Sequence, residues 1–478
     1  MSEQPVVMFT PLPPTRTGIA HYSSMLLPAL RQRVAVQAID DPAHAASSSG
    51  GRIYHLGNNP HHEWIYRAAM ETPGVIVLHD LVLHHLIVEM TLARGDVDGY
   101  ASALRASHGA AGEAWARGRA AGLHSEMGNF LMPASVDVAQ RSRAVIVHNQ
   151  WAADRLRSFG VTTRLFVVPH PFEAQPEARG RRGEIRVRHG FAAEDRVIGL
   201  FGFLTSAKRA EVVLEAFAQA RGREARLRLL IVGEPAPNID IQAFQKDGIT
   251  FAGYVEDAEF AAYFASVDRL VNLRYPSAGE TSGTLIRAFE AGKPVAVSDY
   301  AQFAELPDDC VVKIAFGDGE VGRLAEFFTS DLPDPAAAQQ AWLEEHATIG
   351  RTVEGYLAAL NASPNREPSV RVTAALPLFP HLEVVRVAAH PLTIELENRG
   401  DGPLLTRVYG QPAYRLIVKL FEGSVEVYDR WVTLPRDLAV GERTTIALPI
   451  RGRGTLALYH AIEGVPMLDP PPFARVAL

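Results

Sequence analysis

Short apolar runs alternate with amphipathic stretches over the first part of the chain. Five runs of strand length occur before residue 172, namely VVMF, VAVQAI, VIVLHD, AVIVHN and LFVVPH. Apolar residues recur at helical spacing between them, as in AHYSSMLLPALRQR and QWAADRLRSFG. Continuous β-branched runs that alternate with helices are typical of parallel strands buried on both faces. The pattern therefore predicts a doubly wound α/β domain over residues 1–172.

The same alternation restarts after a charged stretch with few strand formers, EAQPEARGRRGEIRVRHGFAAEDR, which we interpret as a linker. Six further apolar runs follow, namely VIGLFGFL, RLLIVGEP, ITFAGYV, RLVNLRYP, KPVAVSD and VVKIAF. They predict a second Rossmann-like domain over residues 183–331. The next segment, DPAAAQQAWLEEHATIGRTVEGYLAALN, has helical periodicity. We expect it to form one long helix over residues 332–364 that packs back toward the N-terminal domain.

The pattern changes again past Asn365. Short strand candidates are separated there by Gly, Asn, Asp or Pro turns, among them LTIELENRG, YRLIVKLFEG and VEVYDRWVTL. Alternating apolar and polar positions suit a sheet with one solvated face. We therefore predict an antiparallel β-sandwich over residues 372–478. Its aromatic residues are assigned to the core in preference to a sugar-stacking platform: Tyr414, Tyr428, Trp431 and Tyr459.

Composition narrows the class of protein. Of the 478 residues, 47% are hydrophobic and 21% are charged, which is typical of a globular protein with several domains. The net charge of −7 gives no general attraction to nucleic acid, so no nucleic-acid partner is expected. Cys310 is the single cysteine, which excludes an intramolecular disulfide and fits a reducing compartment. The first residues, MSEQPVVMFTPLPP, lack the basic segment and apolar core of a secretory signal, and no apolar run reaches the length of about 18 residues that a membrane span needs. We therefore expect a cytoplasmic protein.

Motifs of several other chemistries are missing from the sequence. It has no Walker loop, no G-x-G-x-x-G and no G-x-S-x-G, which argues against an NTPase, a dinucleotide-binding enzyme and a serine hydrolase. The histidines of NNPHHEW and HDLVLHH lack the spacing of a zinc site, so no metal is predicted. Of these histidines, His79 ends a predicted strand and is a candidate for function. His61 and His62 are assigned to an acceptor groove.

The segment GETSGTLIRAFEAGKP, which starts at Gly279, combines a helix cap with two carboxylates. Ser282 or Thr281 can cap the helix, whose N-terminus exposes unpaired amides and a partial positive charge. The segment follows a buried strand at its carboxyl end, where open α/β sheets bind ligands. Lys208 and Arg209 reach the same edge from the turn after an earlier strand. These surroundings favour a phosphate site over an ordinary capped helix.

Both α/β halves resemble glycosyltransferase family 4, whose members are retaining enzymes of the GT-B fold. The donor half of that family is similar, in order, to GLFGFLTSAKRAEVVLEAF, LLIVGE, ITFAGYV, GETSGTLIRAFEAGKPVAVSD and FAEL. PLPPTRTGIAHYSSMLLPAL resembles the family's glycine-bearing first loop, and GVIVLHDL resembles its strand that ends in an active-site histidine. The resemblance implies two Rossmann-like domains that face across a cleft, with the C-terminal sandwich as an appended domain.

The resemblance also implies roles for individual residues. Glu290 is expected to bind the ribose of a nucleotide sugar, and Glu305 to lie near the base or ribose. Gly283 and Thr284 are expected to meet the diphosphate through their backbone amides. The other implied residues are Lys208 and Arg209, which neutralise the diphosphate, Gly18, which lines the cleft opposite, and His79, which contacts the transferred sugar.

One spacing departs from the family's pattern. The family separates its two glutamates by seven residues, which would place the first one at Ser282 in this chain. Nine residues separate Glu280 from Glu290 instead. Either Glu280 acts on the sugar from a longer turn, as a catalytic residue, or Ser282 takes that place.

The sequence thus predicts a retaining, metal-independent glycosyltransferase that needs no cofactor. We expect a nucleotide-diphosphate sugar as co-substrate and a glycan or lipid-linked acceptor, in surface polysaccharide synthesis. Peripheral membrane association and self-association are left open. The alternatives are a non-catalytic GT-B scaffold that binds nucleotide sugar or glycan, and a nucleotide-sugar epimerase on the same fold. Phe203 favours the scaffold, because it stands where many family members have arginine, unless Arg209 or Arg274 supplies that charge.

Overall fold

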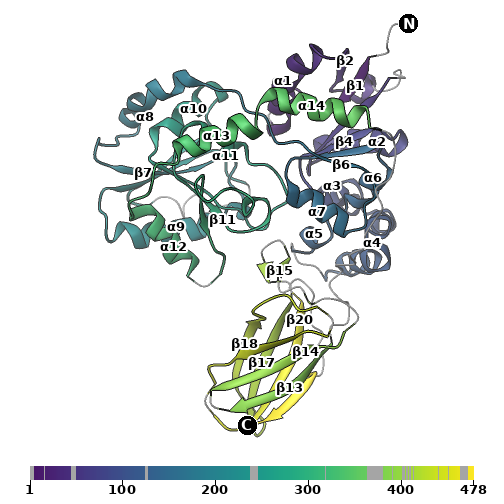
Figure 1. Ribbon diagram of the computed structural model, residues 1–478, viewed down its shortest axis with the longest axis vertical. Helices are drawn as coiled ribbons and strands as arrows, with labels where there is room; N and C mark the ends of the chain where they lie inside the picture. The colour runs from purple at the N-terminus through teal and green to yellow at the C-terminus, as the bar shows by residue number, and fades with distance from the viewer. Residues whose placement is uncertain are drawn as a thin grey trace. The chain divides into compact units, whose positions relative to one another are not determined.

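The computed structural model describes residues 5–15, 17–44, 50–123, 127–236, 246–317 and 319–362 (Figure 1). Nearer the C-terminus it describes 381–389, 391–400, 404, 407–408, 411–412, 414–439, 441–450, 452–462 and 472–478. The chain divides into two compact units, the first made of residues 1–81, 141–153 and 163–366, the second of residues 82–140, 154–162 and 367–478. The predicted end of the long helix at residue 364 and the predicted start of the sandwich at residue 372 lie outside the described residues.

The first unit contains a sheet of six parallel strands in the order β2-β1-β3-β4-β5-β6. These strands are β1 (Val6–Phe9), β2 (Val36–Ile39), β3 (Arg52–Leu56), β4 (Val75–Leu78), β5 (Ala144–Val147) and β6 (Leu165–Val167). The five predicted apolar runs correspond to five of them. β3, with the sequence RIYHL, escapes prediction because arginine and histidine interrupt its apolar run.

The second parallel sheet of this unit has the order β12-β11-β10-β7-β8-β9. Its strands are β7 (Arg196–Phe201), β8 (Leu227–Val232), β9 (Ile249–Gly253), β10 (Arg269–Asn272), β11 (Val295–Ser298) and β12 (Val312–Ile314). All six coincide with predicted runs. The chain reverses its direction across the sheet between β7 and β10, and such a switch point is where open α/β sheets bind ligands at the strands' carboxyl ends.

Helices cover both faces of the second sheet, as Figure 1 shows. α10 (Asp257–Ser266), α11 (Gly283–Glu290) and α13 (Ala336–His346) pack on one face, and α9 (Ala210–Arg221) and α12 (Glu320–Thr329) on the other. The remaining helices of eight or more residues that begin in this unit are α1 (Gly18–Arg31), α2 (Glu63–Glu71), α7 (Gln150–Ser158) and α14 (Ile349–Leu360). The predicted linker contains a further short helix, α8 (Arg182–Arg188), whose Ile185 is fully buried in the core of the second sheet.

The single long helix predicted over residues 332–364 is wrong, since two helices occupy this segment. α13 ends at His346, and Thr348 caps α14 by accepting a hydrogen bond from the Arg351 N–H at 3.4 Å. The two helices serve different cores, because Leu343 of α13 packs with the second sheet and Tyr356 of α14 packs with the first. The break therefore lets one segment join both sheets.

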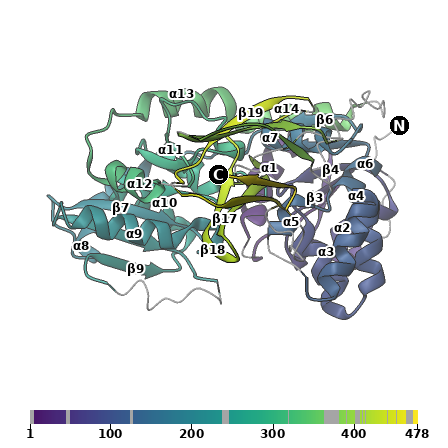
Figure 2. The same cartoon turned by 90° about the horizontal axis from the view of Figure 1, so that it is seen from below.

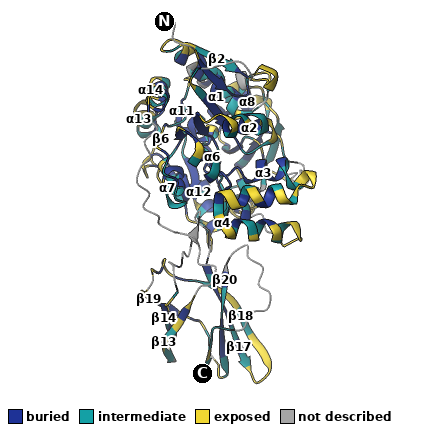
Figure 3. Cartoon of the chain, turned by 90° about the vertical axis from the view of Figure 1, so that its right-hand side faces the viewer, coloured by how far each residue is buried: buried dark blue, intermediate teal, exposed yellow. Residues whose placement is uncertain are grey.

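The second unit combines helices with antiparallel strands. Its longer helices are α3 (His84–Met90) and α4 (Val97–Ala120), and α4 turns one exposed side to solvent in Figure 3. One antiparallel sheet has the order β13-β14-β19 and the other β18-β17-β20-β21, with β17 and β18 side by side in Figures 1 and 2. These strands are β13 (Leu382–Ala389), β14 (Leu392–Asn398), β17 (Tyr414–Glu422), β18 (Val425–Thr433), β19 (Arg443–Ala447), β20 (Thr455–Ile462) and β21 (Ala474–Ala477). The two sheets share one hydrophobic core, which is the predicted sandwich arrangement.

The aromatic residues of the sandwich do not all lie in its core. Tyr414 is fully buried and Tyr428 packs against the core from its edge. Trp431 is 49% exposed, so its assignment to the core is wrong, and the Arg415 guanidinium lies 5.8 Å from its ring centroid.

Among the helices of the described residues, none is both long and apolar enough to cross a membrane.

Candidate functional site

The switch point of the second sheet brings two loops together. One loop leaves β7 at Gly202, where φ is +87°, a conformation that favours glycine. A Cβ atom at this position would lie 2.6 Å from Lys208 Nζ and 3.2 Å from Thr284 Oγ1, which begins the other element. The missing side chain therefore keeps the Lys208 ammonium and the start of α11 close to each other.

Lys208 is a buried cation, with 4% of its surface exposed. Its ammonium donates a hydrogen bond to the Phe201 carbonyl at the end of β7. Burial lowers the pKa of the Lys208 ammonium well below its usual value, Arg274 lowers it further, and Glu280 opposes the shift. A bound anion would relieve this electrostatic cost, so the site is suited to a negatively charged group.

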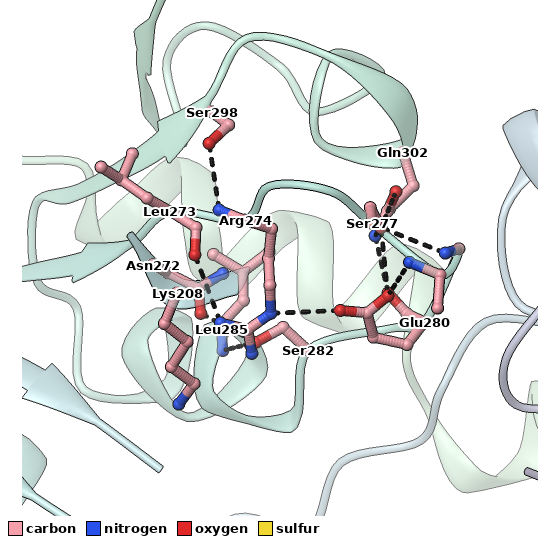
Figure 4. A network of polar contacts seen from close by, with 12 residues as sticks. Lys208, Asn272, Leu273, Arg274, Ser277, Glu280, Ser282, Leu285, Ser298 and Gln302 are labelled. Carbon is pink, nitrogen blue, oxygen red and sulfur yellow. Dashed lines mark hydrogen bonds and ion pairs between the residues drawn. The ribbon is translucent and has the colours of Figure 1, made fainter. Parts of the chain in front are cut away.

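The N-terminus of α11 lies beside this ammonium (Figure 4). The Ser282 hydroxyl caps the helix by accepting from the Leu285 N–H at 3.3 Å and donates to Asn272 Oδ1 at 2.9 Å. The side-chain amide nitrogen of Asn272 is buried and has no hydrogen-bond partner among the described residues. Gly283 has open space around the position of a Cβ, so a ligand can approach its backbone amide closely.

Glu280 lies in the loop between β10 and α11 and is held by three donors. Its Oε1 accepts from Arg274 Nε at 3.1 Å, and its Oε2 accepts from the Ser277 hydroxyl at 3.0 Å and the Ala278 N–H at 2.9 Å (Figure 4). The ion pair is partly buried, with 12% of the Arg274 side chain and 25% of the Glu280 side chain exposed. The structure thus places Glu280 and Ser282 in the loop before α11, close to Lys208, and the roles of the three residues stay predictions.

Glu290 stands apart from this group, at the opposite end of α11. Its carboxylate accepts from the Gln175 backbone N–H and from an Arg287 guanidinium N–H, the latter at 2.9 Å. Arg287 also donates to the Glu173 carbonyl at 3.1 Å. One carboxylate oxygen therefore faces the segment that joins the two sheets, the other is held by Arg287 of the same helix, and the cavity beside them is only about 10 Å³.

Arg209 is engaged elsewhere. Its guanidinium makes two hydrogen bonds with the buried Glu320 carboxylate, at 2.9 and 2.7 Å. It also lies 4.5 Å from the Phe316 ring centroid and 5.5 Å from that of Tyr275. Its charge is compensated by this carboxylate, so the structure does not bring it together with Lys208. Arg274, the other candidate to supply the charge that Phe203 lacks, is paired with Glu280.

The carboxyl edge of the first sheet carries histidines in place of these charges. Three of them follow one another across β3, β4 and β5: His55 Nδ1 lies 2.9 Å from His79 Nε2, and His79 Nδ1 lies 3.1 Å from His148 Nε2. His148 Nδ1 ends the chain at the Val168 carbonyl, 2.8 Å away. At the other end, His55 Nε2 lies 3.5 Å from the Tyr356 hydroxyl.

One set of tautomers satisfies this chain of hydrogen bonds. A carbonyl can only accept, so His148 carries its proton on Nδ1 and accepts on Nε2. His79 must then donate from Nδ1 and accept on Nε2, and His55 must do the same. Tyr356 donates to His55, and the Tyr22 hydroxyl, 2.9 Å from it, donates to Tyr356. Every donor in the chain points in one direction.

Burial favours the neutral form of the three linked histidines, His55, His79 and His148. Burial lowers the pKa of His55 and His79 well below the usual range, and neighbouring histidines lower it further. Burial lowers the pKa of His148 to about 4 and that of the adjacent His170 to about 3. Both ring nitrogens of His79 are engaged, so the expected contact of this residue with a sugar cannot be a hydrogen bond from its ring as it stands.

His62 is buried as well, and its Nδ1 contacts the His55 carbonyl at 2.9 Å, whereas its neighbour His61 is exposed. Gly18 begins α1 after the Thr17 cap and has open space at its Cβ position, as a cleft-lining residue would. Among the described residues, no group of three or more His, Cys, Asp or Glu side chains has the arrangement to hold a metal ion.

Asp80 is a candidate that the sequence analysis missed. Leu81 N–H donates to the Ala278 carbonyl at 2.6 Å, and a Cβ at Gly279 would lie 2.8 Å from the Leu81 Cβ, so the loop after β4 closely approaches the loop of Glu280. Asp80 Oδ2 accepts from the Asn58 N–H at 2.7 Å. Burial raises the pKa of Asp80 to about 7, and Glu280 contributes to the rise. Its position directly after His79, at a strand end, was the available signal.

Ser282 and Glu305 line a common cavity of about 250 Å³ in the first unit. Glu305 Oε2 accepts from the Gln150 N–H at 3.2 Å, at the start of α7. The cavity wall also includes His148, Ile286 and Trp342. Two of the residues predicted to bind the donor, Ser282 and Glu305, therefore share this cavity with His148, one of the three linked histidines.

The chain is similar to several known proteins. Residues 195–330, which span the second sheet, match the sequence model of the family described as Glycosyl transferases group 1. Alpha-monoglucosyldiacylglycerol synthase of Streptococcus pneumoniae is 25% identical over 166 residues, a match that covers 32% of this chain and only 36% of that protein.

Crystal structures of Alr3699/HepE from Anabaena, in complex with UDP and glucose and with UDP-glucose, align over 74% of this chain and 99% of theirs. The TM-score is 0.50 in both cases, and the sequence identity is 14% and 15%. At such identity the likeness concerns the fold alone. The protein therefore has the GT-B fold, two Rossmann-like domains with parallel sheets, to which antiparallel sheets are added near the C-terminus.

Proposed function

We propose that the protein is a retaining glycosyltransferase that transfers a sugar from a nucleotide-diphosphate donor without a metal ion. The observation that carries this proposal is the convergence of Lys208, Glu280 and the N-terminus of α11 at the switch point of the second sheet. The convergence lies within the residues that match the glycosyltransferase family model. HepE, which shares the fold, binds UDP-glucose, so a UDP-sugar is the first donor to test.

In this proposal the first task of the site is to stabilise the departing diphosphate. The bond between the anomeric carbon and the phosphate oxygen breaks, and negative charge grows on that oxygen. The proposal assigns the stabilisation of this charge to the Lys208 ammonium and the backbone amides of Gly283 and Thr284, and the closeness of Lys208 to the start of α11 supports it. The lowered pKa of Lys208 makes its ammonium form depend on a nearby anion, which the diphosphate provides.

The second task is to orient the sugar. Arg274, Ser277 and Ala278 fix the Glu280 carboxylate, which then accepts hydroxyl protons of the sugar in a defined direction. The acceptor hydroxyl attacks on the face that the diphosphate leaves, and its proton passes to the departing phosphate oxygen. A new bond forms from the acceptor oxygen to the anomeric carbon, nucleoside diphosphate is released, and no enzyme nucleophile is needed.

The remaining residues of the site have supporting roles in the proposal. Gly18 lines the opposite wall, and His79 presents its ring to the sugar from within the neutral chain. Glu290 binds the ribose only after it exchanges the Gln175 N–H and the Arg287 contact for ribose hydroxyls. Glu305 stays near the nucleotide, and Arg209 supports the site through Glu320 rather than by contact with the phosphates.

The acceptor is a glycan or a lipid-linked molecule, and the reaction belongs to surface polysaccharide synthesis in the cytoplasm. A lipid acceptor is supported by the similarity to a protein whose name denotes the synthesis of a glucosylated diacylglycerol. Phe203, which is 54% exposed beside the site, favours the second candidate, a GT-B protein that binds nucleotide sugar without transferring it.

Release of UDP separates these two functions. The protein is incubated with UDP-glucose and other UDP-sugars, with and without glycan and lipid acceptors, and free UDP is measured. The transferase releases UDP and consumes acceptor, whereas the binding protein raises its melting temperature with UDP-sugar but releases no UDP. If the protein releases no UDP and shows no thermal shift with any nucleotide sugar, both candidate functions are contradicted.

A further inference from the structure

Gln302 is buried and is linked to Glu280 in two ways, directly at the backbone carbonyl and through Ser277 at the carboxylate. It lies on the one-turn helix η7 (Ala301–Phe303) and is 7% exposed. Its side-chain nitrogen Nε2 lies 2.8 Å from the Ser277 hydroxyl and 2.8 Å from the Glu280 carbonyl (Figure 4). Ser277, which is fully buried, in turn lies 3.0 Å from Glu280 Oε2.

The protons of this network can be assigned from its acceptors. The Glu280 carbonyl can only accept, so one proton of the Gln302 amide group points at it. The second amide proton goes to the Ser277 oxygen, which also accepts from the Gly279 N–H at 3.1 Å. The single Ser277 hydroxyl proton has two acceptors at 3.0 Å, Glu280 Oε2 and Gln302 Oε1, and it is directed to Glu280 because a charged carboxylate is the stronger acceptor.

The backbone that presents Gln302 is strained. Ala301, directly before it, has φ of +52°, which is rare for a residue with a side chain. Such a conformation persists only where the surrounding contacts hold it, and it occurs often at functional sites. Here it turns the Gln302 amide group toward the loop between β10 and α11.

We propose that Gln302 is a positioning residue for Glu280. It fixes the Glu280 carboxylate through Ser277 and holds the Glu280 backbone carbonyl by a direct hydrogen bond. This inference rests on the proposed function, since Glu280 is the group that faces the sugar. The network reaches neither Lys208 nor the amides at the start of α11 in the hydrogen bonds described above. Gln302 therefore governs recognition of the sugar and leaves recognition of the diphosphate to other groups.

The test compares Gln302→Leu with Gln339→Leu as a matched control. Gln339 is a fully buried glutamine of the same unit whose Nε2 donates to two backbone carbonyls, those of Lys293 and Cys310. Affinities for UDP and for UDP-glucose are measured by calorimetry for both variants. We expect Gln302→Leu to weaken UDP-glucose about tenfold and UDP less than about twofold, because one well-placed hydrogen bond corresponds to roughly that change. The control should change both ligands alike, and Gln302→Glu, which keeps one acceptor but loses both donors, should not rescue.

Hydrogen exchange gives an arm that needs no ligand. In Gln302→Leu the amides of residues 277–282 should exchange at least about tenfold faster than in the wild type, and in Gln339→Leu they should not. Unchanged exchange in Gln302→Leu, or equal losses of UDP and UDP-glucose affinity, would overturn the role of Gln302. If the wild type binds neither ligand, the proposed uridine donor fails, and the exchange result alone decides whether Gln302 positions Glu280.

Discussion

The carboxyl edges of the two parallel sheets have the same architecture, but one carries a chain of neutral side chains and the other carries charged ones. The edge of the first sheet carries a chain of neutral histidines and tyrosines in which each nitrogen of the three linked histidines has a partner. The edge of the second carries Lys208, Arg274 and Glu280 beside the side-chain nitrogen of Asn272, which has no hydrogen-bond partner in the part of the chain that the structure describes. At the first edge the polar groups of the linked histidines already have hydrogen-bond partners, so we expect this edge to line the site without binding charge. At the second edge a buried ammonium and the Asn272 nitrogen can gain from an anionic or hydroxyl-bearing ligand, so we expect this edge to bind the donor. The predictions below separate these two roles.

The largest effect is expected from Lys208→Met on the charged edge. Removal of a pre-positioned donor to the leaving group should lower the rate of UDP release from UDP-glucose about 10²–10³-fold. The melting temperature should not fall, because burial disfavours the ammonium in the absence of an anion. Lys313→Met on β12, where the lysine pairs with the exposed carboxylate of Asp308, is the control and should keep its activity. Equal rates in the two variants would show that Lys208 is structural.

The second prediction concerns the neutral edge and the stability of the fold in acid. The pKa of His148 is lowered from 6.5 to about 4, so the unfolded chain binds a proton at higher pH than the folded one. The stability from this residue is complete above pH 6.5 and is lost as the pH falls toward 4. The gap corresponds to roughly 3 kcal/mol in the free energy of unfolding.

Urea unfolding between pH 7 and pH 4 measures this loss. His148→Gln should show a shallower decline than the wild type, whereas His85→Gln, at a half-exposed position outside the chain, should follow the wild type. If all three proteins decline in parallel, the neutral chain does not set the acid stability.

A smaller effect is expected from Glu290→Ala. Loss of a carboxylate that accepts ribose hydroxyls should weaken UDP about tenfold in calorimetry, with the fold intact. Glu215→Ala, on the exposed side of α9, should bind UDP as the wild type does. Normal UDP affinity in Glu290→Ala would mean that the carboxylate only anchors the chain segment of Gln175.

The smallest effect is expected from Asp80→Asn. Ionised Asp80 beside Glu280 repels an anionic donor, so the affinity of the wild type for UDP-glucose should fall a few-fold as the pH rises through about 7. The amide stays neutral and should remove this dependence. Affinities measured from pH 6 to pH 8 should therefore diverge at the alkaline end, and parallel curves would contradict the placement of Asp80.

Elements with strong apolar periodicity were predictable from the sequence, and those that depend on tertiary contacts were not. All strands of the second sheet follow from continuous β-branched runs, whereas β3 and α8 contain polar residues that only packing justifies. The sequence past Pro335 predicts one long helix because no proline marks the cap at Thr348, and a single glycine such as Gly350 is tolerated inside a helical pattern.

The site divides in the same way. The cap at Ser282 and the place of Lys208 at a strand end follow from local spacing and from the rule for ligand sites in parallel sheets. The pairing of Arg209 with Glu320 joins residues 111 positions apart, and the contact of Tyr356 with His55 joins residues 301 apart. Such contacts depend on strand order and side-chain direction, which the periodicity of a single sequence does not contain.

The histidine chain has a sense of direction, and this has a consequence for which sequences can replace it. Because the Val168 carbonyl cannot donate, no single histidine can switch its tautomer without breaking a hydrogen bond. The hydrogen bonds of the three histidines therefore all keep the same direction. A substitute at position 79 must accept on one side and donate on the other, which an asparagine or glutamine amide can do in one orientation only. A lysine can only donate, so it would leave the His55 Nδ1–H without an acceptor, and a leucine can do neither, so it would leave both His55 and His148 without a partner in the middle of the domain.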